Sequence, residues 1–513
     1  MTSTVWHHRA MEPLDVQACY RALQTRDSRF DGRLFVGVTS TGIYCRPICP
    51  ARTPKFENCR FFTSAMAAQT AGFRPCLRCR PETAPDLASW RGTSNSVSRA
   101  LALIAEGALD NENAAVDLLA GRLGIGGRQL RRLFKQHLGT TPKAVAQIRR
   151  VLFAKQLIQE TELSMADVAL ASGFGSVRRF NETFCNLFQR PPSALRSNRS
   201  PALPDGSTAH PAVTLRLRYR PPYDWCSMLA YLKARAIGGV EWTDDNCYWR
   251  TISQDGQVGT VQVAHLAADN SLAATVHFPS VKVLPGIVAC VRRVFDIGAD
   301  VETIGMHLSR DALLAPLVAQ RPGLRLPGGW DSFELAVRAI LGQQVTVEAG
   351  RQLATKLVAL CSSPIPIERV NLPVLTATFP TAAELLAADL KTLGMPSTRK
   401  AALKALAAAV ISDPEFFQTY STVEDVVTRL RTIPGIGDWT AQYIALRALR
   451  DTDAFPATDV GLLRGVALMD GGRPATAYLL TRAEPWRPWR AYAAQHLWAA
   501  DALSAETLRG AHA

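Results

Sequence analysis

The 513-residue sequence contains no apolar run close to the roughly 18 residues that a membrane-spanning helix needs. Its first residues, MTSTVWHHRAMEPLD, also lack the apolar core of a signal peptide. These absences argue against a membrane protein and a secreted protein, so we expect a cytoplasmic chain. Hydrophobic residues make up 47% and charged residues 20%, as in folded globular proteins. At about 150 residues per domain, the length predicts three or four domains.

A cytoplasmic chain also has little use for disulfides, because that compartment keeps thiols reduced. The eleven cysteines are therefore interpreted as core residues, metal ligands or nucleophiles. Four of them form two pairs, Cys45-x3-Cys49 and Cys76-x2-Cys79, with 26 residues between the pairs. Because Zn²⁺ binds four thiolates in a tetrahedron, this spacing predicts one structural zinc site. Cys59 is the alternative ligand, but it stands alone and is interpreted as structural.

Positive charge is concentrated at one end of the chain. Residues 1–200 hold 28 Lys and Arg against 15 Asp and Glu, whereas residues 201–513 hold 30 against 29. Such a field favours a polyanionic partner, since each neutralised phosphate of a nucleic acid releases counterions. The N-terminal part is therefore predicted to bind nucleic acid.

Two segments, 116–139 and 165–189, each show apolar residues at helical spacing, a turn with glycine, and a second helix rich in arginine. A helix over 142–160 connects them. This pattern predicts two helix-turn-helix units whose second helices enter a major groove of DNA. The arginines expected to contact DNA are Arg128, Arg131, Arg132, Arg178 and Arg179. The duplicated pattern resembles the DNA-binding module of AraC-type activators, although Gly126 and Gly127 stand where a Ser cap is common.

The rest of the chain divides by composition. Residues 201–212 belong to a Ser-, Pro- and Ala-rich stretch and are predicted to be a linker. Residues 213–300 mix short β-like runs with helices, and residues 301–513 are strongly helical. The expected fold class is multidomain, mainly α with α+β parts. The fragment IPGIG between two helices predicts a helical hairpin that presents backbone N–H groups to a DNA phosphate. This predicted DNA-binding loop includes Pro434, Gly435 and Gly437.

The segment FVGVTSTGIYCRPICPAR, followed by AGFRPCLRCRPE, resembles the methyl-acceptor domain of Ada-type alkylation-response regulators. In that family a helix-turn-helix pair follows in the same order. The resemblance implies a domain over 1–92 and a DNA-binding domain over 93–200. It also implies that Cys45 is both a zinc ligand and the irreversible acceptor of a methyl group from a DNA phosphotriester. Cys49, Cys76 and Cys79 would complete the site, and Arg46 would orient the phosphotriester.

Further expectations follow from this resemblance. The partners would be alkylated double-stranded DNA, a promoter operator and RNA polymerase. Methylation of Cys45 would strengthen promoter binding, because it removes one negative charge from the cluster. The PCHR motif of a second methyltransferase half is absent, so removal of methyl groups from guanine oxygen is not implied.

The segments RAILGQ, LGMP, PGIGDWTAQYIALR and WRPWRAYAAQHLW resemble AlkA-type 3-methyladenine DNA glycosylases with a hairpin-helix-hairpin. The resemblance implies excision of alkylated purines with Asp459 as the catalytic carboxylate and no organic cofactor. Trp439 stands where lyase-competent relatives have lysine, which predicts a monofunctional enzyme. Gln344 occupies the position of a wedge that fills the hole left by the extruded base. The residues expected to stack on that base are Trp439, Tyr443, Trp498 and Tyr231.

The sequence therefore predicts a monomeric fusion that senses DNA alkylation, regulates a promoter and excises alkylated bases at the nucleoid. One alternative is a transcription factor whose glycosylase-like half is only a DNA-binding scaffold. Another is a structural zinc protein joined to a housekeeping glycosylase, which would bind zinc without methyl transfer.

Overall fold

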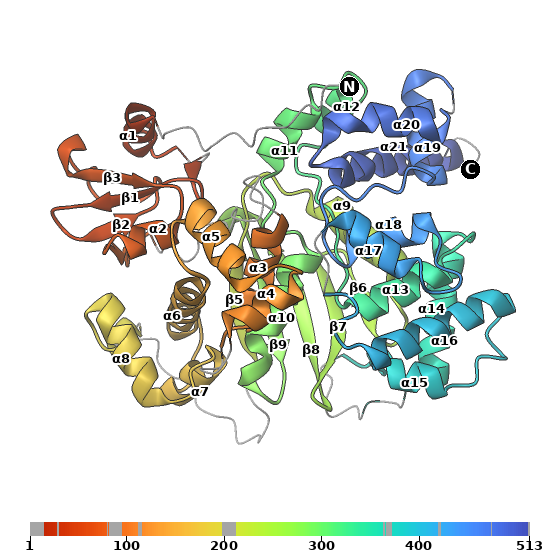
Figure 1. The fold of residues 1–513 in the computed structure, drawn as a ribbon, viewed down its shortest axis with the longest axis horizontal. Helices are drawn as coiled ribbons and strands as arrows, with labels where there is room; N and C mark the ends of the chain where they lie inside the picture. The colour runs from red at the N-terminus through yellow and green to blue at the C-terminus, as the bar shows by residue number, and fades with distance from the viewer. Residues whose placement is uncertain are drawn as a thin grey trace.

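The computed structural model describes residues 15–27, 30–79, 81, 95–110, 115–196, 212–362, 365, 372–418, 422–472 and 474–510. Along the chain, a small mixed domain is followed by short helices, a five-stranded sheet and a large helical domain (Figure 1). The predicted multidomain fold, mainly α with α+β parts, is confirmed. Within these ranges, no helix is long and apolar enough to cross a bilayer. The predicted linker lies outside the described residues, apart from Ala212.

The first unit, here called the cysteine-rich domain, covers the described residues between 15 and 81. Its sheet has the order β3-β1-β2-β4, in which β1 is antiparallel to both neighbours and β2 is parallel to β4. The apolar core consists of two small clusters, so apolar packing contributes little to the stability of this domain. Its elements are α1 (Val16–Gln24), β1 (Phe35–Val38), β2 (Ile43–Cys45), β3 (Cys59–Phe62), α2 (Ala65–Thr70) and β4 (Arg74–Pro75).

The two predicted helix-turn-helix units are present. In the first, Leu130, Phe134 and Leu138 repeat at every fourth position, so they share one buried face of α5. Phenylalanines at the same spacing form the buried face of α8 in the second unit. The helices are α3 (Asn95–Ala105), α4 (Val116–Arg122), α5 (Gly127–Leu138), α6 (Pro142–Glu160), α7 (Met165–Ala171) and α8 (Val177–Phe188).

The five-stranded sheet is antiparallel throughout, with the order β5-β9-β8-β7-β6. On β5 the buried Val213, Leu215 and Leu217 alternate with exposed residues, as expected for a strand with one covered face. The elements of this part are β5 (Val213–Arg218), α9 (Trp225–Arg235), β6 (Glu241–Thr243), β7 (Cys247–Gln254), β8 (Gln257–Leu266), β9 (Ser271–His277) and α10 (Leu284–Val294).

The second helix-turn-helix unit and the sheet share one apolar core. Buried residues from the C-terminal half of α6, from α7 and α8, and from β5, β8 and β9 form a single cluster. At its edge the Gln156 side chain donates to the Arg216 carbonyl at 3.1 Å. Packing therefore joins two parts that the sequence separates by a linker.

The large helical domain has one core that runs from α11 to α21. It contains both helices of the predicted hairpin, α17 and α18. The bounds are α11 (Val301–Leu308), α12 (Leu314–Gln320), α13 (Ser332–Leu341), α14 (Val347–Cys361), α15 (Ala382–Ala387), α16 (Ser397–Ser412), α17 (Val423–Leu430), α18 (Asp438–Arg447), α19 (Val460–Asp470), α20 (Thr476–Ala483) and α21 (Arg490–Gly510).

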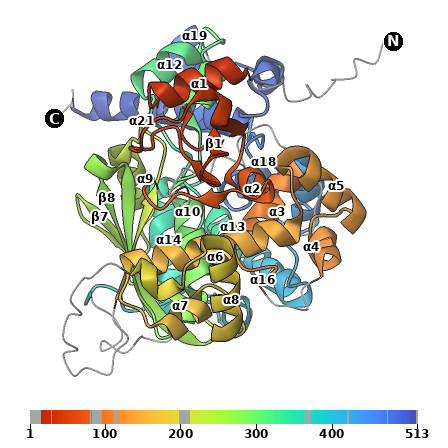
Figure 2. The same cartoon turned by 90° about the vertical axis from the view of Figure 1, so that its left-hand side faces the viewer.

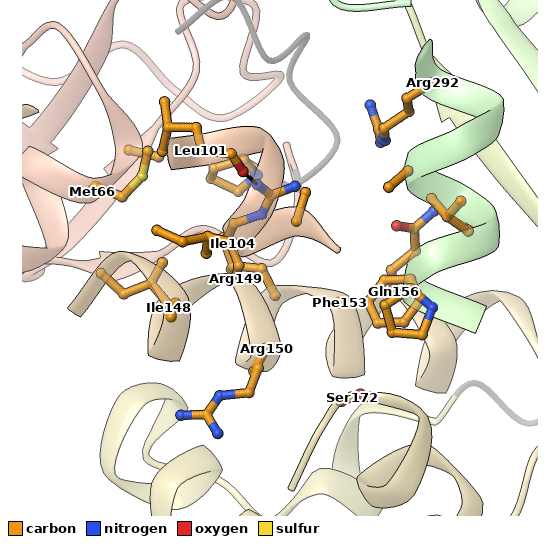
Figure 3. A pocket seen from close by; sticks show the side chains of 18 of the residues that line it. Met66, Leu101, Ile104, Ile148, Arg149, Arg150, Phe153, Gln156, Ser172 and Arg292 are labelled. Atoms are coloured by element: carbon orange, nitrogen blue, oxygen red, sulfur yellow. Dashed lines mark hydrogen bonds between the residues drawn. The ribbon is translucent and has the colours of Figure 1, made fainter. Parts of the chain in front are cut away.

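The cysteine-rich domain lies above α6 to α8 in both orientations (Figures 1 and 2). It also contacts the helical domain, where Arg33 pairs with Asp300, the N-cap of α11. A cavity of about 200 Å³ lies where the cysteine-rich domain, the helix-turn-helix units and α10 meet (Figure 3). Its lining combines apolar side chains such as Ile104 and Phe153 with Arg149 and Arg292.

Candidate functional sites

Cys45, Cys49, Cys76 and Cys79 form one cluster. Their four sulfur atoms lie within 4.8 Å of one another, and the Cys49 and Cys76 sulfurs are 3.9 Å apart. A tetrahedral zinc site with Zn–S bonds of about 2.3 Å has sulfurs about 3.8 Å apart. The donor set and its spacing therefore fit Zn²⁺, and one structural zinc is assigned to these residues.

Strand pairing explains why two distant segments meet there. Strands β2 and β4 are parallel, with Tyr44 opposite Pro75, so Cys45 and Cys76 follow at the same end of the sheet. The Cys76 amide donates to the Tyr44 carbonyl at 3.0 Å, which continues this pairing. Each short cysteine spacing then turns the chain back, so that Cys49 and Cys79 face the first two sulfurs.

Cys45 differs from the other three ligands in exposure. Cys49, Cys76 and Cys79 are 6 to 7% exposed, whereas Cys45 is only half-buried. A nucleophile must be reached by its substrate, and Cys45 is the most exposed residue of this cluster. Cys59 lies on β3, where its thiol donates to the Lys55 carbonyl at 3.3 Å, apart from the cluster.

Arg46 has a different environment from the one that the sequence suggested. Its side chain is 4% exposed, and its guanidinium pairs with Asp31 and donates to the Cys79 carbonyl at 3.1 Å. Its backbone amide donates to the Cys79 sulfur at 3.3 Å. Arg46 thus joins Asp31 to the Cys79 end of the cluster, and its side chain is buried in this conformation.

The thiols of the cluster influence one another strongly. Hydrogen bonds from the other three, Cys45 first, lower the pKa of Cys76, whereas those from Cys49 and Cys76 raise the pKa of Cys45. Four neighbouring thiols cannot all be thiolates without a cation, because like charges at this distance repel. A bound Zn²⁺ would supply that charge and keep the sulfurs deprotonated.

The arginines predicted to contact DNA lie on exposed faces of α5 and α8. Two of them have acidic neighbours, since Arg131 approaches Asp117 at 3.3 Å and Arg178 approaches Glu182 at 3.0 Å. Exposed pairs of this kind are weak, so they leave the positive faces available. The helices that carry these arginines begin differently, because Ser176 caps α8 through its hydroxyl whereas Gly126 gives α5 no side-chain cap. The arginines predicted to contact DNA are Arg128, Arg131 and Arg132 on α5, and Arg178 and Arg179 on α8.

The predicted hairpin is formed by α17, α18 and the loop between them. Pro434, Gly435 and Gly437 lie in that loop, and Gly437 is the N-cap of α18. Gly435 has a φ of +87°, and a Cβ there would approach the Ala402 Cβ within 2.7 Å, so glycine is required. Gln344 lies on the neighbouring turn after α13, exposed and with a φ of +55°.

Asp459 is the N-cap of α19 and is held by three donors. Its carboxylate accepts from the Leu462 amide at 3.0 Å, from the Trp439 indole at 2.7 Å and from the Trp498 indole at 2.8 Å. The donors come from α18, α19 and α21. The carboxylate is half-buried, so its orientation is determined while one side stays accessible.

The four predicted aromatic residues meet next to this carboxylate. Trp439 stacks on Tyr443 with ring centres 5.4 Å apart, and Trp498 meets Tyr443 edge to face at 6.2 Å. Tyr231, from α9, places its hydroxyl 3.3 Å from that of Tyr443. All four rings are half-buried. The structure thus brings together residues that lie far apart in the sequence.

Sequence reasoning missed two cations in this cluster. Arg447 is 2% exposed, and its guanidinium lies over the rings of Tyr231 at 4.8 Å and Trp498 at 4.9 Å. Arg235 lies over the other side of the cluster, 3.9 Å from the Tyr231 ring. The spacing of Trp439, Tyr443 and Arg447, four residues each, was the available signal, because it places them on one face of α18.

These geometries define a DNA-repair protein with a metal-binding methyl-acceptor domain, a helix-turn-helix module and a glycosylase domain that contains the helical hairpin of α17 and α18. Four family models agree. The metal-binding domain of Ada matches residues 18–82 and a helix-turn-helix domain matches 119–198. The AlkA N-terminal domain matches 214–331, and the HhH-GPD superfamily of base excision DNA repair proteins matches 337–491. DNA is thus the partner of this class of protein.

A probable bifunctional transcriptional activator/DNA repair enzyme AlkA of Mycobacterium tuberculosis is 38% identical over 94% of this chain and 96% of its own length. The chain therefore belongs to this family of bifunctional activator and repair proteins. DNA-3-methyladenine glycosylase 2 of Escherichia coli is 36% identical over 55% of this chain and 95% of its own length. A 3-methyladenine DNA glycosylase from Archaeoglobus fulgidus shares the fold, with a TM-score of 0.50 and 19% identity over 56% of this chain and 97% of its own.

Proposed function

We propose that this protein transfers methyl groups from DNA methylphosphotriesters to Cys45, regulates a promoter and excises alkylated purines such as 3-methyladenine. The observation that carries the proposal is the pair of complete sites in one chain. One site has a half-buried cysteine, Cys45, in a four-cysteine cluster, and the other has a carboxylate held beside four aromatic rings.

In the first activity, the Cys45 thiolate attacks the methyl carbon of a phosphotriester. The new S–C bond forms as the C–O bond breaks, and its electron pair leaves with the phosphate, which becomes a diester anion. Cys45 becomes a thioether and is not regenerated, so each protein molecule reacts once. The exposure of Cys45 and the burial of the other three sulfurs support its role as the acceptor.

In the second activity, Asp459 faces the sugar of an extruded nucleotide. Positive charge develops on that sugar as the glycosidic bond breaks, and a fixed carboxylate stabilises it. Water then adds to the sugar and gives a proton to Asp459. The rings of Trp439, Tyr443, Trp498 and Tyr231 stack on the base. No lysine stands at position 439, so the enzyme is monofunctional and borohydride does not trap it on DNA.

The cluster also links the two roles of the first domain. Four thiolates and one Zn²⁺ have a net charge of −2, which repels DNA, and methylation of Cys45 reduces it to −1. Removing one unit of repulsion near a phosphate is worth about 1 kcal/mol. Self-methylation therefore strengthens operator binding by the exposed arginines of α5 and α8.

The remaining assignments belong to the same proposal. The domains cover 1–92, 93–200, 213–300 and 301–513, with a linker over 201–212. The protein acts as a monomer in the cytoplasm, at the nucleoid, and contacts RNA polymerase at the promoter. Gln344 fills the gap left by the base, and the hairpin loop binds a DNA phosphate. The exposed position of Gln344 beside that loop supports this role.

One experiment tests both activities together. Purified protein is incubated with methylated duplex DNA. Released bases are then quantified, and the mass of each cysteine-containing peptide is measured by mass spectrometry. We expect 3-methyladenine in solution and a gain of one methyl group on the Cys45 peptide alone. A methyl group on another cysteine contradicts the acceptor assignment. Absence of released base would favour the scaffold alternative, against which the ordered Asp459 carboxylate argues.

A further inference from the structure

The aromatic cluster contains two hydroxyl groups that stacking does not need. The hydroxyls of Tyr231 on α9 and Tyr443 on α18 are 3.3 Å apart, close enough for one to donate to the other. Two phenols have two O–H hydrogens, so one hydrogen of this pair stays available for a third group. The rings are half-buried, which leaves part of each accessible to solvent.

Two guanidinium groups lie directly against this pair. Arg447 lies over the rings of Tyr231 and Tyr443, at 4.8 and 5.7 Å, and Arg235 lies 3.9 Å from the Tyr231 ring. Arg447 is held in place, because it donates to the Pro327 carbonyl at 3.0 Å and to the Gln495 side chain at 2.8 Å. Its Nε is buried and has no hydrogen-bond partner among the described residues.

The two guanidinium charges lower the pKa of both phenols, but the net shift differs between Tyr231 and Tyr443. Burial alone would raise the pKa of Tyr231, but Arg447 and Arg235 outweigh it and lower that pKa. Burial and the neighbouring Tyr231 raise the pKa of Tyr443 to about 12. Tyr231 is therefore the more acidic member, and its neighbours favour hydrogen bonds to groups that carry negative charge.

The site contains charged groups of both signs around the same aromatic rings. Asp459 supplies negative charge, and the two indoles that hold it, Trp439 and Trp498, also contact the Tyr443 ring. Arg447 supplies positive charge, 5.7 Å from the centre of the Tyr443 ring and 4.9 Å from that of Trp498. Breaking a glycosidic bond also separates charge: the sugar becomes positive, and an uncharged base becomes negative.

We propose that the Tyr231–Tyr443 hydroxyl pair, with Arg447 over both rings, is a hydrogen-bond donor that determines how well uncharged purines are released. The inference rests on the proposed glycosylase activity and adds a specificity-determining group to it. The cation stacked on these rings gives no advantage to a base that is already positive. It stabilises a base that acquires negative charge as it leaves.

The bond changes explain why the two kinds of base differ. When the C1′–N9 bond breaks, its electron pair goes to the base. A base methylated at N3 or N7 is a cation, so the pair makes it neutral and no proton is needed. An uncharged purine becomes an anion, accepts the O–H hydrogen bond of the pair, and takes up one proton from solvent. In both cases water supplies hydroxide to C1′ and its proton goes to Asp459.

The test removes only a hydroxyl. Tyr231→Phe and the wild type are compared in single-turnover release of hypoxanthine, an uncharged purine, and of 3-methyladenine, a cationic one, from duplex DNA. In Tyr231→Phe we expect the rate of hypoxanthine release, divided by that of 3-methyladenine release, to fall at least about tenfold. This is the usual effect of losing a hydrogen bond to a charged group. The loss appears in the rate of the chemical step rather than in DNA affinity, because the negative charge exists only in the transition state.

Tyr478→Phe is the matched control. Tyr478 is 53% exposed on α20, and Arg482 donates to its hydroxyl at 3.4 Å from four residues away, as an exposed counterpart of Tyr231 and Arg235. Tyr443→Phe and the double variant complete a cycle. If the hydroxyls act as a pair, each single variant lowers the ratio, and the double variant lowers it by less than the product of the two. Additive losses contradict the pairing.

The outcomes separate this inference from the proposed function. If the wild type releases 3-methyladenine but no hypoxanthine, the inference is wrong and the glycosylase proposal stands. If Tyr231→Phe slows both bases equally, the hydroxyl has a structural role and the inference fails. If the wild type releases neither base, both proposals fail together. Thermal unfolding of each variant checks that the fold is retained.

Discussion

The cysteine cluster and the Asp459 site are both built around negative charge, but they are stabilised in opposite ways. In the cluster, four sulfurs meet within 4.8 Å, and the domain around them has only a small apolar core. At the other site, three N–H donors hold one carboxylate at 2.7 to 3.0 Å, inside a domain with a large continuous core.

The two sites therefore keep a negatively charged group in the folded protein by different means. The cluster needs an added cation, because its own thiols repel one another when ionised. The carboxylate needs no added group, since its hydrogen bonds come from the protein itself. Metal removal should therefore destroy the first site and spare the second, whereas loss of one carboxylate should do the reverse.

The largest expected effect is the loss of the metal. Cys76→Ser should unfold the cysteine-rich domain, because structural Zn²⁺ contributes about 10 kcal/mol or more to small domains. Zinc content and thermal unfolding measure this loss, and excision of 3-methyladenine by the same sample should persist. Cys59→Ser is the control, since Cys59 lies outside the cluster. Full zinc content with unchanged stability would remove Cys76 from the ligand set.

Asp459→Asn should have the next largest effect. The substitution keeps the shape of the side chain but removes the charge that we propose faces the sugar, so excision should fall roughly 100- to 1000-fold, equivalent to about 3 to 4 kcal/mol. Zinc content and DNA affinity should stay close to those of the wild type. Asp269→Asn, which disturbs only an exposed pair with Arg216, is the matched control. Full activity of the Asp459 variant would show that another group supports catalysis.

A smaller change sharpens the description of that carboxylate. Trp498→Phe keeps an aromatic ring but removes the indole N–H that donates to Asp459 at 2.8 Å. Hydrogen bonds to charged groups are worth about 1.5 to 3 kcal/mol, so excision should slow by roughly tenfold or more. Trp242→Phe, in the five-stranded sheet, controls for the loss of an indole elsewhere. Equal rates in the two variants would mean that this donor does not position the carboxylate.

The smallest expected effect concerns charge on the cluster. After exposure to methylphosphotriester DNA, operator affinity should rise several-fold, or about 1 kcal/mol, and the gain should shrink as salt screens the repulsion. The excision rate should not change, because Cys45 belongs to the other site. Titration of methylated and unmethylated protein against the operator at two salt concentrations makes the measurement. Identical affinity at low salt would leave Cys45 without a regulatory role.

The sequence alone determined the features that depend on short spacing. The two cysteine pairs, the repeated helix-turn-helix pattern and the IPGIG turn are local, so their residue types and intervals already specify what they form. Family resemblance extended this to Asp459 and its aromatic neighbours. In each case the structure places the predicted residues together, as with Cys45 and Cys76 at the ends of parallel strands.

Only the tertiary structure decided which side chains are buried and which face one another. The resemblance assigned Arg46 the orientation of a phosphotriester, and it gave no sign that folding buries this side chain against Asp31 and the Cys79 carbonyl. The sequence assigned no role to Arg447. Its surroundings form only when α9, α18 and α21 place three rings around its guanidinium group. Burial and charge pairing depend on contacts between distant segments, and spacing along one segment does not contain that information.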